Sequence, residues 1–281
     1  MQDFFPGDSY ETPAGCRRFL TDRLFGWTRW SFYVRFFRVV LWSKARAQKG
    51  VFTQEALAEA SHNILKAIEG CGGRISIKGL DNIRKTEGPV VFIGNHMSTL
   101  EAVILPCLIA PIKPVSFIVK AKLVTGTFFG PVMTALDPVT VTRTDPRKDL
   151  TDVLTQGPQK IATGRSLVIF PQAAARTRSV TFNPSKFNSL GVKLAARAGV
   201  SVIPVALKTD FWGDGKALHD FGVIRRKEPI CFEFGEPVPV SGRGKQEHEQ
   251  IVEFIIARLK SWGVPVNEAA SGASDETESG K

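Results

Sequence analysis

The chain has 281 residues, 43% of them hydrophobic, and carries a formal net charge of +10. This length suits one α/β domain with an N-terminal extension, and four scattered cysteines without a C-x-x-C pair indicate reduced, mostly buried thiols rather than a disulfide framework. The opening residues lack the pattern of a signal peptide, and no stretch reaches the roughly 18 uncharged apolar residues of a spanning helix. The basic excess predicts an acidic partner, which composition alone leaves open among anionic lipid, nucleic acid and a phosphorylated substrate.

Residues 17–46 combine many aromatic and aliphatic side chains with eight lysines and arginines and a single acid, Asp22. This mixture is typical of a helix that lies in the headgroup layer of a membrane. Residues at helical spacing follow Leu20: Leu24, Trp27, Ser31, Val34 and Leu41. The alternative is a helix packed on the protein's own surface, and a nucleic-acid surface is also compatible with the arginine–aromatic mixture. We expect an anionic membrane surface as the partner, and no nucleic acid.

From residue 53 onward, helical and strand patterns alternate. Short apolar runs predict strands at 74–78, 90–94, 115–120, 139–142, 166–170, 200–207 and 230–234. Helices are predicted at 53–70, 99–109, 127–136, 147–163, 189–198 and 246–262. The pattern predicts an α/β fold with a mixed, largely parallel sheet flanked by helices, preceded by an N-terminal helical membrane-associating segment. We expect the segment at 1–72, the α/β domain at 73–264 and a disordered, polar tail at 265–281.

The run Asn95-His96-Met97-Ser98-Thr99-Leu100-Glu101 is the first candidate site. His96 follows an apolar strand, where functional residues collect in α/β folds. Ser98 and Glu101 fit a capping box, which would turn the Glu101 carboxylate back toward His96. A carboxylate there would fix the tautomer of His96, whose other nitrogen could take a proton from an alcohol. The alternative is a capping glutamate beside a polar residue at a strand end.

Further motifs follow in a fixed order. An arginine, Arg143, comes after the strand at 139–142, and Phe170-Pro171-Gln172 ends another strand before Arg176-Thr177-Arg178-Ser179. Val202-Ile203-Pro204-Val205 comes last. This ordered set resembles the glycerolipid acyltransferase family of the lysophosphatidic acid acyltransferase type, whose motifs are N-H-x-S-x-x-D, F-P-E-G-T-R-S and a run around V-I-P-V. The resemblance covers residues 75 to 240.

The resemblance implies an O-acyltransferase in which His96 is the catalytic base and Glu101 its carboxylate partner. It implies further that Arg143, and Arg176 or Arg178, bind the phosphate of the acceptor, because the guanidinium fork donates two parallel hydrogen bonds. Asn95, Ser98 and Gln172 complete the expected substrate-binding set. The acyl donor would be acyl-CoA or acyl-ACP, and neither a metal nor a cofactor is expected, since the four histidines form no ligand cluster.

The chain departs from the family pattern at several positions. Glu101 replaces the usual Asp, Asp137 stands where the second motif often has Gly, and Gln172 replaces the Glu of F-P-E. Ala173-Ala174-Ala175 occupies the place of Gly-Thr, so the assignment of the phosphate-binding arginine stays open between Arg176 and Arg178.

We therefore predict transfer of a fatty acyl group to the hydroxyl of a lysophospholipid, such as a 1-acylglycerol 3-phosphate, at the cytoplasmic face of a membrane. The alternatives are a catalytically altered, membrane-binding member of the family and transfer to a non-phosphate acceptor. A segment at 211–215, with Phe211 and Trp212, is expected to be a surface turn.

Overall fold

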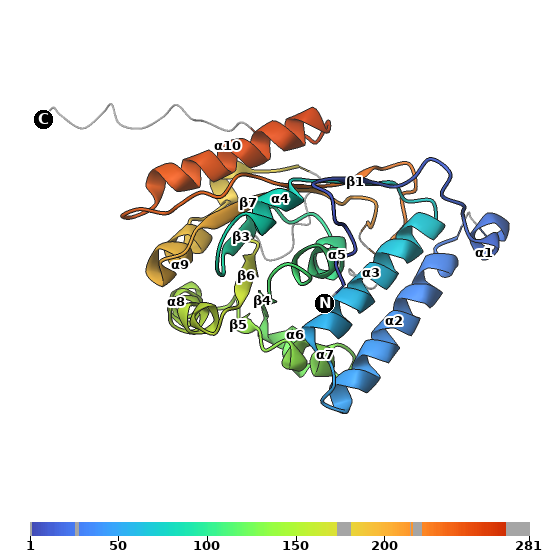
Figure 1. Ribbon diagram of the computed structural model, residues 1–281, viewed down its shortest axis with the longest axis horizontal. Helices are drawn as coiled ribbons and strands as arrows, with labels where there is room; N and C mark the ends of the chain where they lie inside the picture. The colour runs from blue at the N-terminus through green and yellow to red at the C-terminus, as the bar shows by residue number, and fades with distance from the viewer. Residues whose placement is uncertain (1, 26–27, 173–180, 214, 216–220, 268–281) are drawn as a thin grey trace, which may run out of the picture.

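The computed structural model describes residues 2–25, 28–172, 181–213, 215 and 221–267 (Figure 1). In this part of the chain, eight strands form one sheet with the order β1-β2-β8-β7-β3-β6-β4-β5. Neighbouring strands run parallel except in the β1–β2 and β7–β8 pairs, which confirms the mixed, largely parallel sheet. The strands are β1 (Tyr10–Glu11), β2 (Ile75–Lys78), β3 (Val91–Gly94), β4 (Val115–Lys120), β5 (Val139–Val141), β6 (Ser166–Ile169), β7 (Val202–Lys208) and β8 (Ile230–Phe234).

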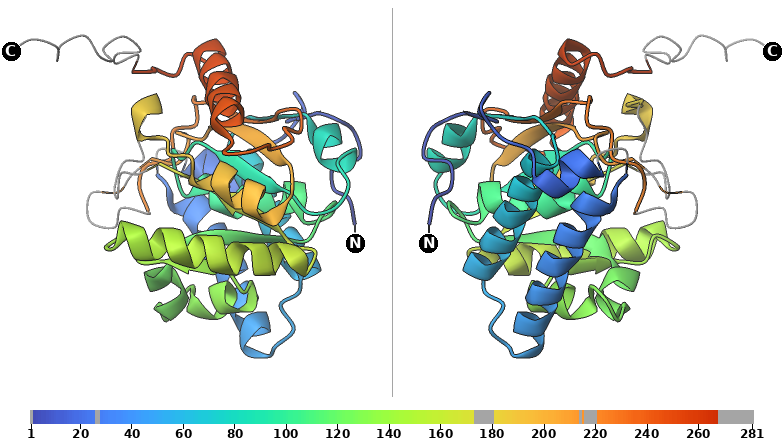
Figure 2. Two further views of the ribbon diagram at one scale, coloured as in Figure 1. Left: turned by 90° about the vertical axis from the view of Figure 1, so that its left-hand side faces the viewer. Right: turned by 90° about the vertical axis from the view of Figure 1, so that its right-hand side faces the viewer.

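Helices cover both faces of the sheet (Figures 1 and 2). The helices are α1 (Leu20–Leu24), α2 (Trp30–Gln48), α3 (Gln54–Gly70), α4 (Leu80–Arg84), α5 (Leu100–Ile109), α6 (Ala121–Thr125), α7 (Gly130–Ala135), α8 (Pro146–Ala162), α9 (Leu190–Ala198) and α10 (Lys245–Ser261), with a 3-10 turn η1 (Pro184–Lys186). One apolar core joins α2, α3 and α5 to the sheet, and a second joins α8, α9 and α10 to the opposite face. Because side chains alternate along a strand, Phe92 of β3 enters the first core while Val91 and Ile93 enter the second.

Local sequence accounts for most element boundaries. All seven predicted strands lie within two residues of the observed ones. The Thr53 side chain caps α3 by accepting the N–H of Ala56 at 3.3 Å. Asp145 caps α8 in the same way, with Pro146 at the first helical position. These signals are local, and the helices predicted at 53–70 and 147–163 lie within one residue of the observed α3 and α8.

Residues 17–46 form two helices and not the one interfacial helix that the sequence suggested. Helix α1 ends at Leu24 and α2 begins at Trp30, and between them Thr28 donates its hydroxyl to the Phe25 carbonyl at 2.7 Å. A distant residue also holds Thr28, because Arg226 donates to the Thr28 carbonyl at 2.9 Å. A contact between residues so far apart in sequence is invisible in a local pattern.

Helix α2 has one buried and one exposed apolar face. Its inner face packs into the first core and includes Phe32, Tyr33 and Phe36. Its outer face presents Trp30 and Leu41, which are 70% and 53% exposed. Packing on the protein's own surface thus explains only the inner face. No helix within the described ranges is long and apolar enough to cross a bilayer.

Two further expectations are corrected. Phe211 and Trp212, expected in a surface turn, are 0% and 1% exposed, because the Trp212 ring packs edge-on against Phe32 and Phe36 of α2 at centroid distances of 5.1 and 5.0 Å. The expected tail at 265–281 cannot begin at 265: Phe182 donates its N–H to the Pro265 carbonyl at 2.9 Å and accepts from Asn267 at 2.8 Å. Residues 268–281 lie outside the described residues.

Candidate active site

His96 lies two residues beyond β3, in the loop that leads into α5. Asn95, directly before it, is buried and makes a two-way bond with the next strand: its amide donates to the Leu207 carbonyl at 2.7 Å and accepts the Leu207 N–H at 2.8 Å. The side chain thereby extends the β3–β7 pairing past the end of the strand. Asn95 fixes the point at which the His96 loop leaves the sheet.

The Glu101 carboxylate is fully buried and lies against His96. One oxygen is 3.1 Å from His96 Nδ1. The other accepts the N–H groups of Met97 and Ser98 at 2.7 and 2.9 Å. It also accepts the hydroxyl of Thr209, the residue after β7, at 2.6 Å. All these contacts suit an ionised, acceptor-only carboxylate, so Nδ1 carries the imidazole proton and Nε2 is left to accept one.

The structure contains both contacts that the sequence analysis considered for Glu101, the helix cap and the contact with His96. The capping-box contact exists, because Glu101 accepts the Ser98 N–H, and the histidine contact exists as well. Ser98 is 0% exposed and its hydroxyl donates to the Thr209 carbonyl at 2.9 Å. The sequence analysis placed Asn95 and Ser98 among substrate-binding residues, but their polar atoms face the protein interior. Both side chains shape the loop.

The His96 ring is half-buried at the surface of the protein. It stacks on Phe170, with ring centroids 4.9 Å apart and planes 16° from parallel, and 30% of its side chain stays exposed. Its backbone N–H donates to Oε1 of Gln172, which follows β6. The amide of Gln172, expected to bind a substrate hydroxyl, therefore holds the His96 backbone. Together these contacts leave the imidazole edge accessible to a ligand.

Arg143 follows β5 and adopts a left-handed backbone conformation, with φ at 60°. Asp149 fixes this turn: its carboxylate accepts the N–H groups of Thr142 and Arg143 at 2.7 and 2.6 Å. Burial raises the pKa of Asp149, but these hydrogen bonds outweigh it and the net pKa is lowered. The guanidinium makes no hydrogen bond to another described side chain, and desolvation lowers its pKa against the opposing effect of Asp149. It is thus available to an anion.

The candidate residues share one edge of the sheet. β7, β3, β6, β4 and β5 are neighbours and run parallel, so their carboxyl ends point the same way. Along this edge the order is Thr209, His96, Gln172, Lys120 and Arg143. Three strand spacings separate His96 from Arg143, which is roughly 14 Å between backbones. A ligand that contacts both must span this edge.

Some expected site residues cannot be placed. Arg176 and Arg178 lie outside the described residues, as does the Ala173-Ala174-Ala175 run. Within the described ranges, no group of three or more His, Cys, Asp or Glu side chains could hold a metal ion. The four cysteines are unpaired, and three of them are buried, as expected from the sequence.

The sequence analysis missed Thr209 and Phe170 as members of the site. Thr209 is 0% exposed and donates to the carboxylate that contacts His96. Its signal was present, because it follows a predicted strand at the same sheet edge as His96. Phe170 was quoted only as part of a motif, yet its ring forms the surface on which the imidazole rests.

Comparison with known proteins finds matches over the part of the chain that carries this site. Residues 74–208 match the model of the acyltransferase family. A 1-acyl-sn-glycerol-3-phosphate acyltransferase of Pseudomonas aeruginosa is 33% identical over 135 residues, 48% of this chain and 49% of that protein. A chloroplastic enzyme of the same name from Arabidopsis thaliana is 30% identical over 145 residues, 52% of this chain and 38% of that protein. The chain thus matches about half or less of the length of these relatives.

A solved structure shares the fold. The crystal structure of the 1-acyl-sn-glycerophosphate acyltransferase PlsC from Thermotoga maritima superposes with a TM-score of 0.59, over 87% of this chain and 94% of that one. The two sequences are 17% identical, so the similarity supports the architecture alone. The α/β arrangement described above is therefore one that a known acyltransferase adopts.

Proposed function

We propose that the chain is an O-acyltransferase that acylates the hydroxyl of a lysophospholipid, because residues 74–208 match the model of the acyltransferase family. The observation that carries the proposal is the His96–Glu101 pair at the carboxyl edge of the sheet, within the matched residues. A buried carboxylate on one imidazole nitrogen and an exposed ring edge on the other side are what a general base requires.

In the proposed reaction, Nε2 of His96 takes the proton from the acceptor hydroxyl while the hydroxyl oxygen attacks the thioester carbonyl. Glu101 keeps the Nδ1 proton in place and stabilises the imidazolium that forms. When the carbon–sulfur bond breaks, the imidazolium returns the proton to the departing thiolate. The acyl ester and the free thiol of the donor result, and no covalent enzyme intermediate is required.

We propose a phosphate-bearing acceptor of the 1-acylglycerol-3-phosphate type. The guanidinium of Arg143 supports this acceptor, because it has no hydrogen-bond partner among the described side chains, lies at the same sheet edge as His96 and can form two parallel hydrogen bonds with a phosphate. Lys120 lies at the end of β4, one of the two strands between them, and adds positive charge to the edge. The donor would be acyl-CoA or acyl-ACP.

The reaction is proposed to take place on an anionic membrane surface, at its cytoplasmic face, to which the N-terminal segment at 1–72 attaches the α/β domain at 73–264. The exposed apolar residues Leu20, Leu24, Trp30, Val34 and Leu41 support this attachment. Basic residues are interleaved with them, as in other interfacial helices. The same residues that the sequence analysis chose at helical spacing are thus solvent-facing, apart from Ser31, which is buried, and Trp27, which lies outside the described residues.

The experiment is a transfer assay with the full chain, read out by mass spectrometry. The acceptors are lysophosphatidic acid, lysophosphatidylglycerol and a neutral monoacylglycerol, each offered with acyl-CoA and with acyl-ACP. We expect transfer to lysophosphatidic acid above all. Transfer only to monoacylglycerol would replace the phosphate acceptor with a neutral one, and no transfer to any acceptor would favour a membrane-binding member of the family that has lost catalysis.

A further inference from the structure

A groove of about 480 Å³ lies between α1, α2 and α3, away from the sheet edge that carries His96. We call it the basic groove. It is lined by three cationic side chains, two neutral polar ones and four apolar ones: Arg35, Arg38, Lys66, Thr21, Asn63, Phe19, Val34, Val39 and Ala67. Figure 2, right, shows the three helices together on one face of the molecule.

The cations of the basic groove have no carboxylate partners among the described residues. The buried carboxylates of α1 and α3, two of the helices that form the groove, already have partners. Asp22 of α1 pairs with Arg18 and Arg226, and Glu69 of α3 accepts the hydroxyls of Tyr10 and Thr12. Arg35 and Arg38 are also three residues apart on α2, a spacing at which like charges repel. The groove therefore concentrates positive charge that the described residues do not neutralise.

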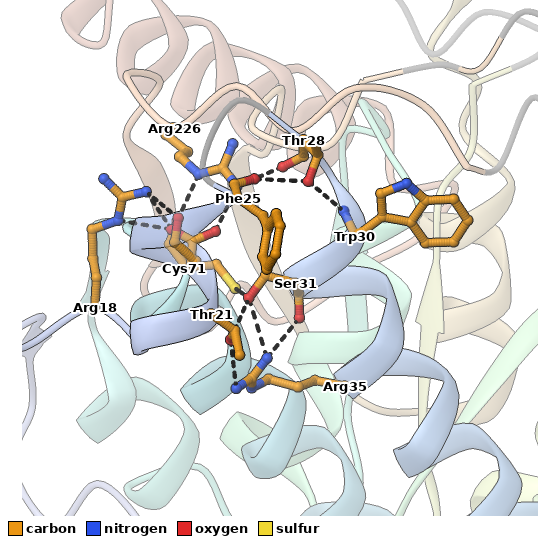
Figure 3. Close-up of polar contacts among 10 residues, drawn as sticks. Arg18, Thr21, Phe25, Thr28, Trp30, Ser31, Arg35, Cys71 and Arg226 are labelled. Carbon is orange, nitrogen blue, oxygen red and sulfur yellow. Dashed lines mark hydrogen bonds and ion pairs between the residues drawn. The ribbon is translucent and has the colours of Figure 1, made fainter.

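Arg35 is held in one orientation (Figure 3). Its guanidinium lies 3.8 Å from the centre of the Phe19 ring. One terminal nitrogen donates to the carbonyl and hydroxyl of Ser31 at 2.9 and 3.2 Å, and the other donates to the Thr21 hydroxyl at 3.2 Å. Of its five N–H donors, two remain for a ligand. A fixed guanidinium loses little freedom when it binds a phosphate.

The wall of the groove that belongs to α1 is also fixed. Asp22 accepts from Arg226 at 2.6 Å, and Arg226 in turn donates to the Cys71 carbonyl at the end of α3 at 3.1 Å. A helix as short as α1 has little stability of its own, so these buried bonds hold it beside α2 and α3. The groove is thereby shaped before any ligand arrives.

The surroundings of the groove identify its occupant. Val34 lines the groove and is 52% exposed, and it continues into the outer apolar face of α2 through Trp30 and Leu41. Free phosphate would gain nothing from this apolar rim, whereas a phospholipid carries an apolar part beside its phosphate. The positive charge of the groove and its apolar rim thus both favour a ligand that carries a phosphate beside an apolar part.

We propose that the basic groove binds the phosphate headgroup of an anionic phospholipid of the membrane, with Arg35, Arg38 and Lys66 on the phosphate and Val34 and Val39 on the glycerol end of the acyl chains. This site is separate from the acceptor site at the sheet edge. The proposal rests on the membrane association put forward under the proposed function. It adds a discrete lipid-binding site to the general attraction between a basic protein surface and an anionic membrane.

The test compares two variants with the same loss of charge. Arg38→Gln/Lys66→Gln removes two exposed cations of the groove, and Lys193→Gln/Arg197→Gln removes two exposed cations of α9 on the opposite side of the molecule (Figure 1). Binding to phosphatidylcholine vesicles with and without phosphatidylglycerol is measured by co-sedimentation. The groove variant should lose roughly 30-fold in affinity for the anionic vesicles, as expected for two basic residues at a membrane surface, and the α9 variant should change little.

A titration with short-chain, monomeric phosphatidylglycerol should saturate at one lipid per chain for the wild type and fail for the groove variant. Equal losses in both variants, or a lipid titration that does not saturate, would overturn the proposal in favour of diffuse attraction. So would displacement of the lipid by an oligonucleotide at equimolar concentration. Transfer to detergent-dispersed acceptor, which needs no membrane, should be unchanged in both variants. If the wild type does not transfer the acyl group to detergent-dispersed acceptor, that result contradicts the proposed function and leaves the groove untouched.

Discussion

The loop around His96 and the basic groove differ in whether their charged side chains are paired with other described residues. At His96, the carboxylate of Glu101 is fully buried and receives donors from the loop itself and from Thr209. In the groove, Arg38 and Lys66 are exposed and have no carboxylate partner among the described residues. Satisfied polar groups hold a geometry, and unsatisfied charges at a surface remain available to a ligand. The difference separates residues that position the reaction from residues that recognise something outside the protein.

Among substitutions of the residues around His96, Glu101→Gln is expected to have the largest effect. The amide cannot accept every hydrogen bond that the carboxylate accepts, and it no longer stabilises a protonated His96. We expect kcat to fall by about 10²–10⁴-fold, the range of general-base contributions. Steady-state kinetics measure the change, and a thermal melt establishes that the variant is folded. Glu253→Gln, an exposed glutamate of α10, is the control. An unchanged kcat in folded Glu101→Gln would remove the carboxylate from the mechanism.

Arg143→Gln tests whether the Arg143 cation at the sheet edge binds a phosphate, as the cations of the groove are proposed to do. Losing a charge-assisted, two-way bond costs about 1.5–3 kcal/mol, so KM for lysophosphatidic acid should rise roughly 10- to 100-fold with little change in kcat. KM for a neutral monoacylglycerol should stay the same. Equal effects on both acceptors would mean that Arg143 does not contact the phosphate.

Thr209→Val removes one donor from Glu101 and keeps the shape of the side chain. We expect kcat to fall about tenfold, because a hydrogen bond to a charged group is lost and the carboxylate is held less firmly. KM for lysophosphatidic acid should stay the same, because Thr209 is fully buried and acts on the site only through Glu101. Thr209→Ser, which keeps the hydroxyl, should restore kcat. An unchanged kcat in folded Thr209→Val would reduce Thr209 to a packing residue.

The smallest effect concerns His62 of α3, whose pKa is lowered to about 4, first by burial and second by Lys66 of the basic groove. The folded-state pKa lies below the ordinary value of 6.5, so this histidine stabilises the fold only when neutral, and stability is lost as the pH falls from 6.5 toward 4. Lys66→Gln should raise the pKa of His62 slightly in an NMR titration. No shift would mean that a counter-ion already neutralises Lys66.

The sequence predicted those parts of the molecule that depend on neighbours along the chain. The apolar runs located the strands, and Ser98 with Glu101 located the start of α5. The pairing of His96 with Glu101 was also predictable, because the two residues are only five positions apart. Their place on one sheet edge with Arg143 followed from parallel strands ending together.

Contacts between distant segments were not predictable in the same way. Thr209 reaches Glu101 across 108 positions, and Arg226 reaches Asp22 across 204. Trp212 seemed to belong to a turn because glycines follow it, yet its ring fills the core beside Phe32. The basic groove itself is formed by three separate helices, so no local pattern could outline it.

The central claim is that His96 is the base of an acyl transfer, and His96→Ala tests it most directly. Release of free thiol from acyl-CoA is followed in the presence of lysophosphatidic acid, with His62→Ala as the control and circular dichroism as the measure of folding. We expect a folded His96→Ala protein whose transfer rate falls to the level without enzyme, while His62→Ala keeps its rate. A folded His96→Ala protein that transfers the acyl group at the wild-type rate would contradict the mechanism.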